Sequence, residues 1–218
     1  LADDGTYLGS DAIALAPFSD QLIYLEEGDW ALLSRAGVRI FDEAGREVDR
    51  PVTPTPSSVS LAEKGNYRHF MAKEIHEQPA VLGHTFGHYL DLSSETVRIA
   101  EAASIDFAGA GRISISACGT AYYAGLVGRY WFERLARMPV DIDIASEFRY
   151  REIPLSPNDL AVFISQSGET ADTLASLRYT RAAGQQIASV VNVPTSSIAR
   201  ESDVALPTLA GPEIGVAS

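Results

Sequence analysis

The second half of the chain alternates short apolar runs with amphipathic stretches, and this alternation restricts the possible folds more than any other feature. Strands are predicted at 113–117, 140–144, 160–165 and 187–191, with a short fifth strand at 204–206. Helices are predicted at 121–137 and 170–183, and Gly184 stands where helices commonly end in a left-handed residue. This order of strand, helix and strand is typical of a parallel sheet, so we predict an α/β fold.

The apolar residues of the predicted helices indicate which side chains enter the core. The helix at 121–137 offers four large apolar side chains to it, Leu126, Tyr130, Phe132 and Leu135. Two further helices are predicted before the sheet, at 67–82 and at 96–102. Pro79 is expected to interrupt the first of these, because proline removes a helical hydrogen bond.

The first 50 residues have a different pattern, in which short apolar runs are separated by Gly, Asp and Pro. Strands are predicted at 12–15, 22–25, 30–33 and 38–41, followed by a hairpin turn and return strand at 42–48. Prolines and serines then break the pattern. We therefore predict a β-rich unit at 1–50, a linker at 51–66 and the α/β unit at 67–218.

Charge and cysteine content exclude several classes of protein. The formal net charge is −12 and no cluster of Lys or Arg occurs, so we expect no nucleic-acid partner. Cys118 is the single cysteine, which excludes an internal disulfide and a cysteine zinc site and favours the cytoplasm. No apolar run approaches the roughly 18 residues that span a bilayer, so we expect no membrane partner. Because the chain begins at Leu1 and ends without a polar tail, we expect it to be a piece of a longer protein.

The strongest local signal lies between the strand at 160–165 and the helix that follows it. There the sequence reads Ser165-Gln166-Ser167-Gly168-Glu169-Thr170. Hydroxyls, an amide and the N–H groups of a helix N-terminus favour an anion, and a glycine lets the backbone approach it closely. A phosphate site is one interpretation. The other is that Ser167 caps the helix and Thr170 is a first-turn hydroxyl; local chemistry leaves the two open.

A second loop, Cys118-Gly119-Thr120-Ala121, follows the strand at 113–117. Ligands of open α/β sheets bind where the strands end, so Thr120 could reach the same phosphate, although an ordinary turn is the commoner outcome for Gly-Thr after a strand. Neither loop has the glycine spacing of a dinucleotide site or a P-loop. Cys118 is expected to be a small buried residue, without a nucleophilic role.

Two clusters of polar residues suggest metal or acid–base chemistry only superficially. The four histidines fall within 20 residues, at His69, His76, His84 and His88, but their spacing does not match a zinc motif, and solvated helix faces explain them better. Asp141 and Asp143 alternate with apolar residues and are expected to point away from the core. We therefore predict no metal site.

Several segments, in order, resemble one family. The loop at 165–173 resembles the phosphosugar loop of sugar isomerase (SIS) domains, particularly those of the glucosamine-6-phosphate synthase family. The segments at 70–79, 145–150 and 213–218 also resemble segments of this family. Residues 10–43 resemble the end of its glutaminase domain. The resemblance implies a flavodoxin-like three-layer α/β/α SIS domain at 67–218. It also implies that residues 1–50 are the β-rich remnant of an N-terminal-nucleophile glutaminase domain.

The resemblance also implies a function. The family is a cytoplasmic transferase that makes glucosamine 6-phosphate and glutamate from fructose 6-phosphate and glutamine, without metal or redox cofactor, and its members are expected to be homodimers. By resemblance, the sugar phosphate is held by Thr120, Ser165, Gln166, Ser167 and Thr170, and the backbone around Val216 and Ser218 lines the sugar. The catalytic groups of both active sites are expected outside this chain, which alone should be inactive.

One departure and one rival interpretation remain. Ala121 stands where the family usually has a serine that contacts the phosphate, so one hydroxyl contact is missing. SIS domains also serve as phosphosugar-binding modules of non-enzymatic transcription regulators, which carry a basic helix-turn-helix segment before the SIS domain. Here the preceding segment is acidic and predicted to be β-rich, which favours the enzyme.

Overall fold

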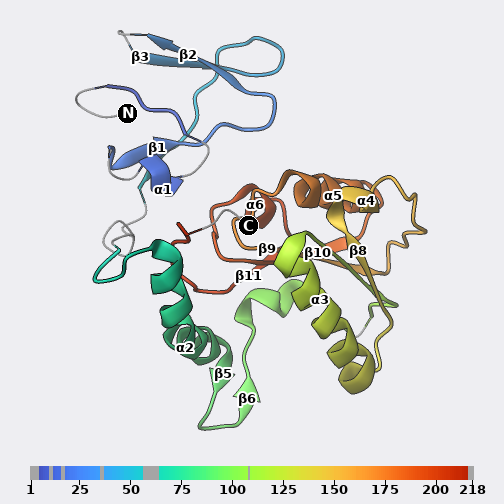
Figure 1. Ribbon diagram of the computed structural model, residues 1–218. Helices are drawn as coiled ribbons and strands as arrows, with labels where there is room; N and C mark the ends of the chain where they lie inside the picture. Colours follow the sequence, from blue (N-terminus) through green and yellow to red (C-terminus); the bar gives the residue numbers. More distant parts are fainter. Residues whose placement is uncertain are drawn as a thin grey trace. The chain divides into compact units, whose positions relative to one another are not determined.

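The computed structural model describes residues 5–9, 12–15, 18–34, 37–55, 64–107 and 109–215 (Figure 1). The chain divides into two compact units. The first comprises Leu1–Lys73 with Pro212–Ile214, and the second comprises Glu74–Gly211 with Gly215–Ser218.

The first unit contains short antiparallel pairs. Strand β1 (Gln21–Ile23) pairs with β4 (Val52–Pro54), and β2 (Trp30–Ser34) pairs with β3 (Gly37–Phe41). A turn closed by the Gly45 N–H and the Asp42 carbonyl, 2.9 Å apart, leads to one bridge between Phe41 and Glu47 at the predicted hairpin. The strand predicted at 12–15 is wrong, because these residues form the short helix α1 (Ala12–Leu15); four apolar residues do not distinguish the two periods.

Strand β4 lies inside the range predicted as linker, and its register pairs Val52 with Ile23. Residues 56–63, which include most of the predicted serine-rich stretch, lie outside the described residues. The three-part division at 1–50, 51–66 and 67–218 stays a prediction.

The second unit is built on a five-stranded sheet in the order β11-β10-β9-β7-β8. Its strands are β7 (Ile113–Ala117), β8 (Val140–Ile144), β9 (Leu160–Ser165), β10 (Gln186–Val191) and β11 (Val204–Pro207), and every pairing is parallel. The predicted α/β class and all five strands are confirmed. The chain leaves β7 toward one edge and returns to β9 before building the other, so the strand order reverses between β7 and β9.

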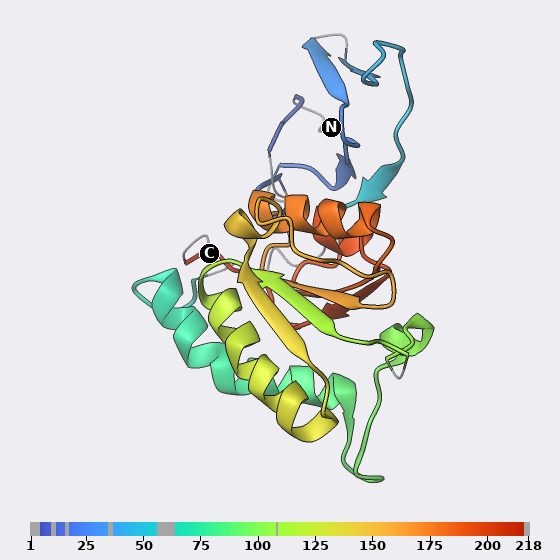
Figure 2. The same ribbon diagram turned by 90° about the vertical axis from the view of Figure 1, so that its right-hand side faces the viewer.

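Helices cover both faces of this sheet (Figure 2). Helix α3 (Gly119–Trp131) lies on one face, while α5 (Ala171–Ala182) and the short helices α4 (Ala145–Phe148) and α6 (Ser197–Arg200) lie on the other. The side chains of β9 alternate accordingly. Leu160 belongs to the core under α3, and Phe163 belongs to the core under α5, where it is fully buried. The three-layer α/β/α arrangement predicted for this unit is confirmed.

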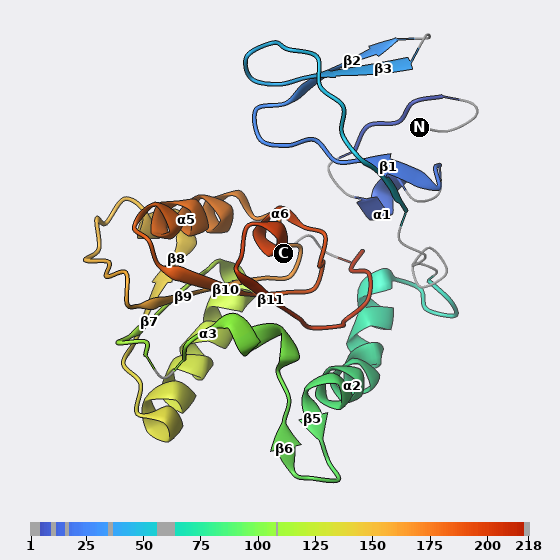
Figure 3. The same cartoon turned by 180° about the vertical axis from the view of Figure 1, so that it is seen from behind.

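Upstream of the sheet, the predicted helix boundaries need correction. Helix α2 (Phe70–Tyr89) contains Pro79 in its interior and continues beyond it. Pro79 therefore does not end the helix, because a proline removes only its own N–H bond and distorts one turn. Residues 96–102, predicted as helix, instead form strand β6 (Thr96–Val97), paired with β5 (Leu90–Asp91), and the start of the 3₁₀ turn η2 (Ala100–Ser104). Figure 3 shows α2 near β11, where the Tyr89 hydroxyl donates to the Pro207 carbonyl at 2.7 Å.

The core assignment for the helix at 121–137 is largely wrong. The segment forms α3 and then one π-helical turn, η3 (Phe132–Ala136), and Tyr130 and Leu135 are 70% and 76% exposed. The reason is Gly125, the one buried residue of α3. A Cβ atom at Gly125 would lie 2.6 Å from Ile142 Cδ1, so the helix approaches the sheet through this glycine and turns its large side chains outward.

The prediction that a left-handed Gly184 ends the helix at 170–183 is confirmed by its φ of +79°.

Candidate phosphate site

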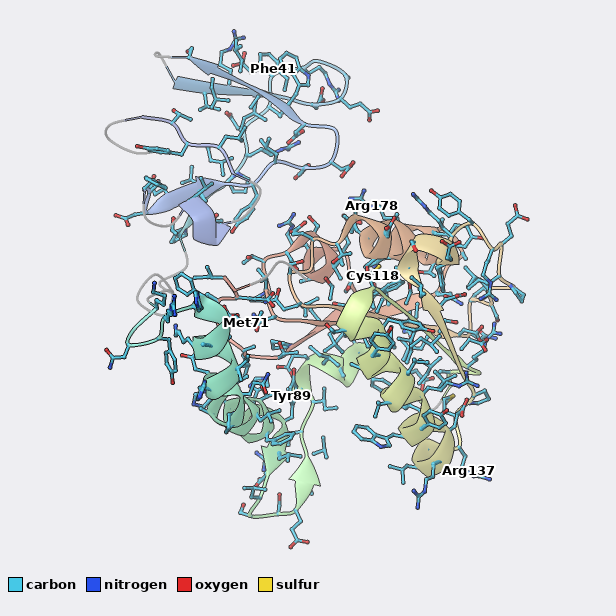
Figure 4. The ribbon with its side chains drawn as sticks, in the orientation of Figure 1. Phe41, Met71, Tyr89, Cys118, Arg137 and Arg178 are labelled. Atoms are coloured by element: carbon cyan, nitrogen blue, oxygen red, sulfur yellow. The ribbon has the colours of Figure 1, made fainter. Side chains whose placement is uncertain are left out.

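The two loops predicted to bind phosphate follow the two strands between which the sheet order reverses. Ala117 at the end of β7 lies opposite Ile164 near the end of β9, in parallel register. Loop 118–121 and loop 165–170 therefore begin at the same edge of the sheet. This is the edge at which open α/β sheets bind ligands. Figure 4 labels Cys118 where β7 passes into α3.

Loop 165–170 is closed by its own hydroxyl groups. The buried Ser165 Oγ accepts from the Gly168 N–H at 3.0 Å and lies 3.1 Å from Thr170 Oγ1. One of these two hydroxyls donates to the other, so one hydroxyl proton of the pair is left for a ligand. Ser167 Oγ accepts from the Glu169 N–H at 3.2 Å. The N-cap of α5 is Thr170, without a side-chain cap bond, so the interpretation of Ser167 as the helix cap is wrong.

Gly168 fits its place only because it has no side chain. Its φ is +67°, and a Cβ atom there would lie 1.9 Å from Ser196 Oγ. Ser196 is buried and caps α6 by accepting from the Ala199 N–H at 3.4 Å. The glycine therefore brings loop 165–170 into direct contact with the start of α6.

Segment 192–198 supports loop 165–170 through hydrogen bonds. The Asn192 N–H donates to the Gln166 carbonyl, and the Ile198 N–H donates to the Gly168 carbonyl, each at 3.0 Å. Glu169 Oε1 accepts from the Ser197 N–H at 2.8 Å, so this carboxylate is bound to α6. Backbone bonds at two points and a side-chain bond at a third hold the loop in one shape.

Donors for an anion come from two helix N-termini. The first N–H groups of an α-helix have no partner within the helix, and the helix dipole is positive at that end. Helix α5 begins at Ala171 and α3 begins at Gly119, whose φ is +56°. Neither loop 118–121 nor loop 165–170 contains Lys or Arg. An anion bound here would be held by N–H groups and hydroxyls, which is a known mode for phosphate.

An ion pair fixes the orientation of α5. Arg178, labelled on α5 in Figure 4, donates from Nε and from a terminal nitrogen to the two oxygens of Glu201, at 2.9 and 2.7 Å. These hydrogen bonds hold the pKa of the Glu201 carboxyl below its ordinary value. Since Glu201 directly follows α6, the pair joins the two helices that meet loop 165–170.

The remaining polar candidates lie apart from this site. All four histidines are exposed, and His88 Nε2 lies 2.6 Å from Glu101 Oε1. Within the part of the chain that the structure describes, no three His, Cys, Asp or Glu side chains are arranged to hold a metal ion. Asp141 and Asp143 bind Arg112 and Arg151 and stay out of the core, as predicted. No helix among the described residues is both long and apolar enough to cross a membrane.

Comparisons with known proteins bear on this site. The pattern of the SIS domain family matches residues 106–218. The chain belongs to the SIS domain family. Among curated relatives, the glutamine–fructose-6-phosphate aminotransferase (isomerizing) of Bradyrhizobium diazoefficiens is 62% identical over 216 residues, 99% of this chain and 36% of that protein. The same enzyme of Brucella abortus is 64% identical over 212 residues, 97% of this chain and 35% of that protein. The resemblance stated from the sequence is thus confirmed, and the chain spans just over a third of the length of these relatives.

Solved structures agree with the SIS assignment. The C-terminal domain of glucosamine-fructose-6-phosphate aminotransferase from Francisella tularensis matches with a TM-score of 0.65 and 44% identity, covering 72% of this chain and 44% of that chain. A glucosamine-6-phosphate deaminase from Thermotoga maritima shares the fold, with a TM-score of 0.51 and 24% identity over 64% of this chain and 40% of that chain.

Within this SIS domain the predicted residues fall into three groups. Ser165, Gln166, Ser167 and Thr170 share one closed loop, and the exposed Thr120 stands at the start of α3 at the same sheet edge. Val216 and Ser218 lie outside the described residues. Sequence reasoning missed the support from Asn192, Ser196 and Glu169. A serine three residues before the Ala199 amide is a recognisable helix cap, but nothing in the sequence indicates that this cap touches Gly168.

Proposed function

We propose that this chain binds fructose 6-phosphate as the sugar-phosphate-binding part of a glutamine–fructose-6-phosphate aminotransferase. The complete enzyme converts fructose 6-phosphate and glutamine to glucosamine 6-phosphate and glutamate. The observation that carries the proposal is the closed hydroxyl loop at 165–170, which lies beside the N-terminus of α5 at the point where the strand order reverses. Relatives that are 62–64% identical over nearly the whole chain and are named for this reaction support it.

Each predicted residue has a role in the proposal. The Ser167 hydroxyl, the free hydroxyl proton of the Ser165–Thr170 pair, the Gln166 amide and the Thr120 hydroxyl donate to the phosphate oxygens, together with N–H groups at the start of α5. The backbone around Val216 and Ser218 lines the sugar. Residues 1–50 are the end of a glutaminase domain, residues 51–66 are a linker, and the complete enzyme is a cytoplasmic homodimer whose catalytic groups lie outside this chain.

The second candidate function, a phosphosugar-binding SIS module of a non-enzymatic transcription regulator, is the weaker one. The curated relatives with 62–64% identity are enzymes, and their match extends through the acidic segment before the SIS domain rather than stopping at it. A DNA-binding regulator would instead carry a basic segment there.

A ³¹P NMR titration of the chain tests the binding step. Fructose 6-phosphate should bind saturably, and fructose should not displace it at equal concentration. Ser167→Ala should weaken binding about tenfold, since one charge-assisted hydrogen bond is lost. The matched control is Ser94→Ala in the turn between β5 and β6, which should bind like the wild type. Absence of saturable binding, or an equal loss in both variants, contradicts the proposal. The protein encoded by the complete gene should form glucosamine 6-phosphate from the two substrates.

A further inference from the structure

Asn192, which directly follows β10, makes an unusual set of side-chain bonds. Its Nδ2 donates to the Gly211 carbonyl at 2.6 Å, and its Oδ1 accepts from the Ala210 N–H at 2.7 Å and from Thr208 Oγ1 at 3.2 Å. One amide thereby binds three residues of the segment after β11. Its donor and acceptor match the backbone groups of that segment, and no other side chain of this length offers both.

The backbone of the same residue faces the other way. The Asn192 N–H donates to the Gln166 carbonyl at 3.0 Å, within loop 165–170. Asn192 therefore binds loop 165–170 through its main chain and segment 208–211 through its side chain.

Segment 208–211 has a conformation that needs such support. Leu209 has a φ of +53° and Gly211 a φ of +74°. The left-handed region is unfavourable for leucine, and such residues persist only where surrounding bonds fix them. Asn192 binds the residues on both sides of Leu209.

Two further bonds fix the chain around this segment. The Thr208 N–H donates to the Val191 carbonyl at 3.0 Å, and the Gly215 N–H donates to Glu74 Oε1 at 2.8 Å. The chain is thus held at Thr208–Gly211 and again at Gly215, directly before the predicted sugar-lining residues Val216 and Ser218.

We propose that Asn192 is a positioning residue that sets the spacing between the phosphate loop and the segment leading to the sugar-lining backbone. This inference rests on the proposed function. Phosphate alone needs loop 165–170, Thr120 and the start of α5, whereas a sugar phosphate also needs the second segment at a fixed separation from the loop. Loss of the Asn192 side chain therefore weakens the binding of sugar phosphate selectively, because the main-chain bond to Gln166 remains.

The test compares two ligands by ³¹P NMR titration, inorganic phosphate and fructose 6-phosphate. Asn192→Ala should weaken fructose 6-phosphate binding about tenfold, the loss expected for two or three hydrogen bonds shared with a flexible segment, and should leave phosphate binding within about twofold. Thr208→Val, a milder change, should act in the same direction by about twofold to threefold. Asn158→Ala, at an exposed asparagine before β9, is the matched control and should affect neither ligand.

Amide hydrogen exchange without ligand gives a second readout. The Ala210 amide should exchange faster in Asn192→Ala and unchanged in Asn158→Ala. Unchanged exchange at Ala210, equal weakening of both ligands, or no weakening of fructose 6-phosphate each overturns the inference while the wild type still binds. A wild-type chain that binds neither ligand overturns the proposed function and the inference together.

Discussion

Helices α3 and α5 both start at the ligand edge of one sheet, yet they are packed very differently. Helix α5 buries four of its residues, Thr173, Ser176, Leu177 and Thr180, while α3 buries only Gly125. The outer side of α3 and η3 instead exposes large apolar side chains, with Tyr123, Tyr130, Trp131 and Leu135 each more than 60% exposed. The loop before α5 is closed by internal hydrogen bonds, whereas Thr120 at the start of α3 is exposed.

This difference assigns unequal roles to the two halves of the site. On the α5 side, packing and hydrogen bonds fix donors in advance, so little order is lost when an anion binds. On the α3 side, Thr120 is exposed at the start of the helix. We therefore expect changes on the α5 side to cost more, in both stability and binding, than equivalent changes on the α3 side.

The largest effect should come from truncating a buried leucine of α5. Leu177 is fully buried, and Leu177→Ala should lower the free energy of unfolding by about 2 to 5 kcal/mol, through lost burial and the cavity that remains. The matched change on the other helix, Leu135→Ala, should stay within about 0.5 kcal/mol, because Leu135 is 76% exposed. Urea denaturation followed by circular dichroism measures both. Similar losses in the two variants would mean that α3 is covered in solution.

The next contrast concerns the two left-handed glycines of the site. Gly168→Ala should destabilise the chain by about 2 to 4 kcal/mol, since it combines an unfavourable φ with a clash against Ser196. Gly119→Ala should cost only about 1 to 2 kcal/mol, because its φ is also positive but nothing lies within 4 Å of the added Cβ. The same denaturation experiment compares them, and equal costs would show that the contact between Gly168 and Ser196 is not tight.

These contrasts also separate what the sequence could predict from what it could not. Strand β9 was predictable because the continuous apolar run at 160–164 marks a buried parallel strand, and β7 because isoleucine and serine alternate along it between turn signals. Their parallel order places both loops at one edge. The outward orientation of Tyr130 and Leu135 was not, since it depends on the close approach of Gly125 to Ile142, a contact distant in sequence. Loop 165–170 is recognisable from its local sequence, whereas its support from Asn192 and Ser196 depends on contacts that are distant in sequence and was missed.

A smaller effect is expected from deleting a hydroxyl of loop 165–170. Thr170→Val keeps the branched shape, and it should weaken fructose 6-phosphate binding about 10- to 100-fold, by loss of a charge-assisted hydrogen bond of about 1.5 to 3 kcal/mol. Thermal stability should fall by no more than about 1 kcal/mol, because the variant loses the bond between Thr170 and Ser165 but makes no change to a helix cap, and Ser165 keeps its bond from the Gly168 N–H. Thr120→Val on the α3 side should weaken binding less, by about 2- to 10-fold. Calorimetric titration and thermal melts measure both quantities. A lowered melting temperature with unchanged affinity would make Thr170 structural.

The smallest effect should come from adding a hydroxyl on the α3 side. Ala121 lies in the first turn of α3, half-buried, at the position where the resembling family usually has serine. Ala121→Ser should tighten fructose 6-phosphate binding about 2- to 10-fold, because a new donor joins the anion at low cost to the helix. Ala124→Ser, at an exposed position three residues further along α3, is the matched control and should leave affinity unchanged. If both variants bind like the wild type, a hydroxyl at position 121 does not reach the phosphate, and Thr120 is left as the one hydroxyl that the start of α3 can offer, which the Thr120→Val variant tests directly.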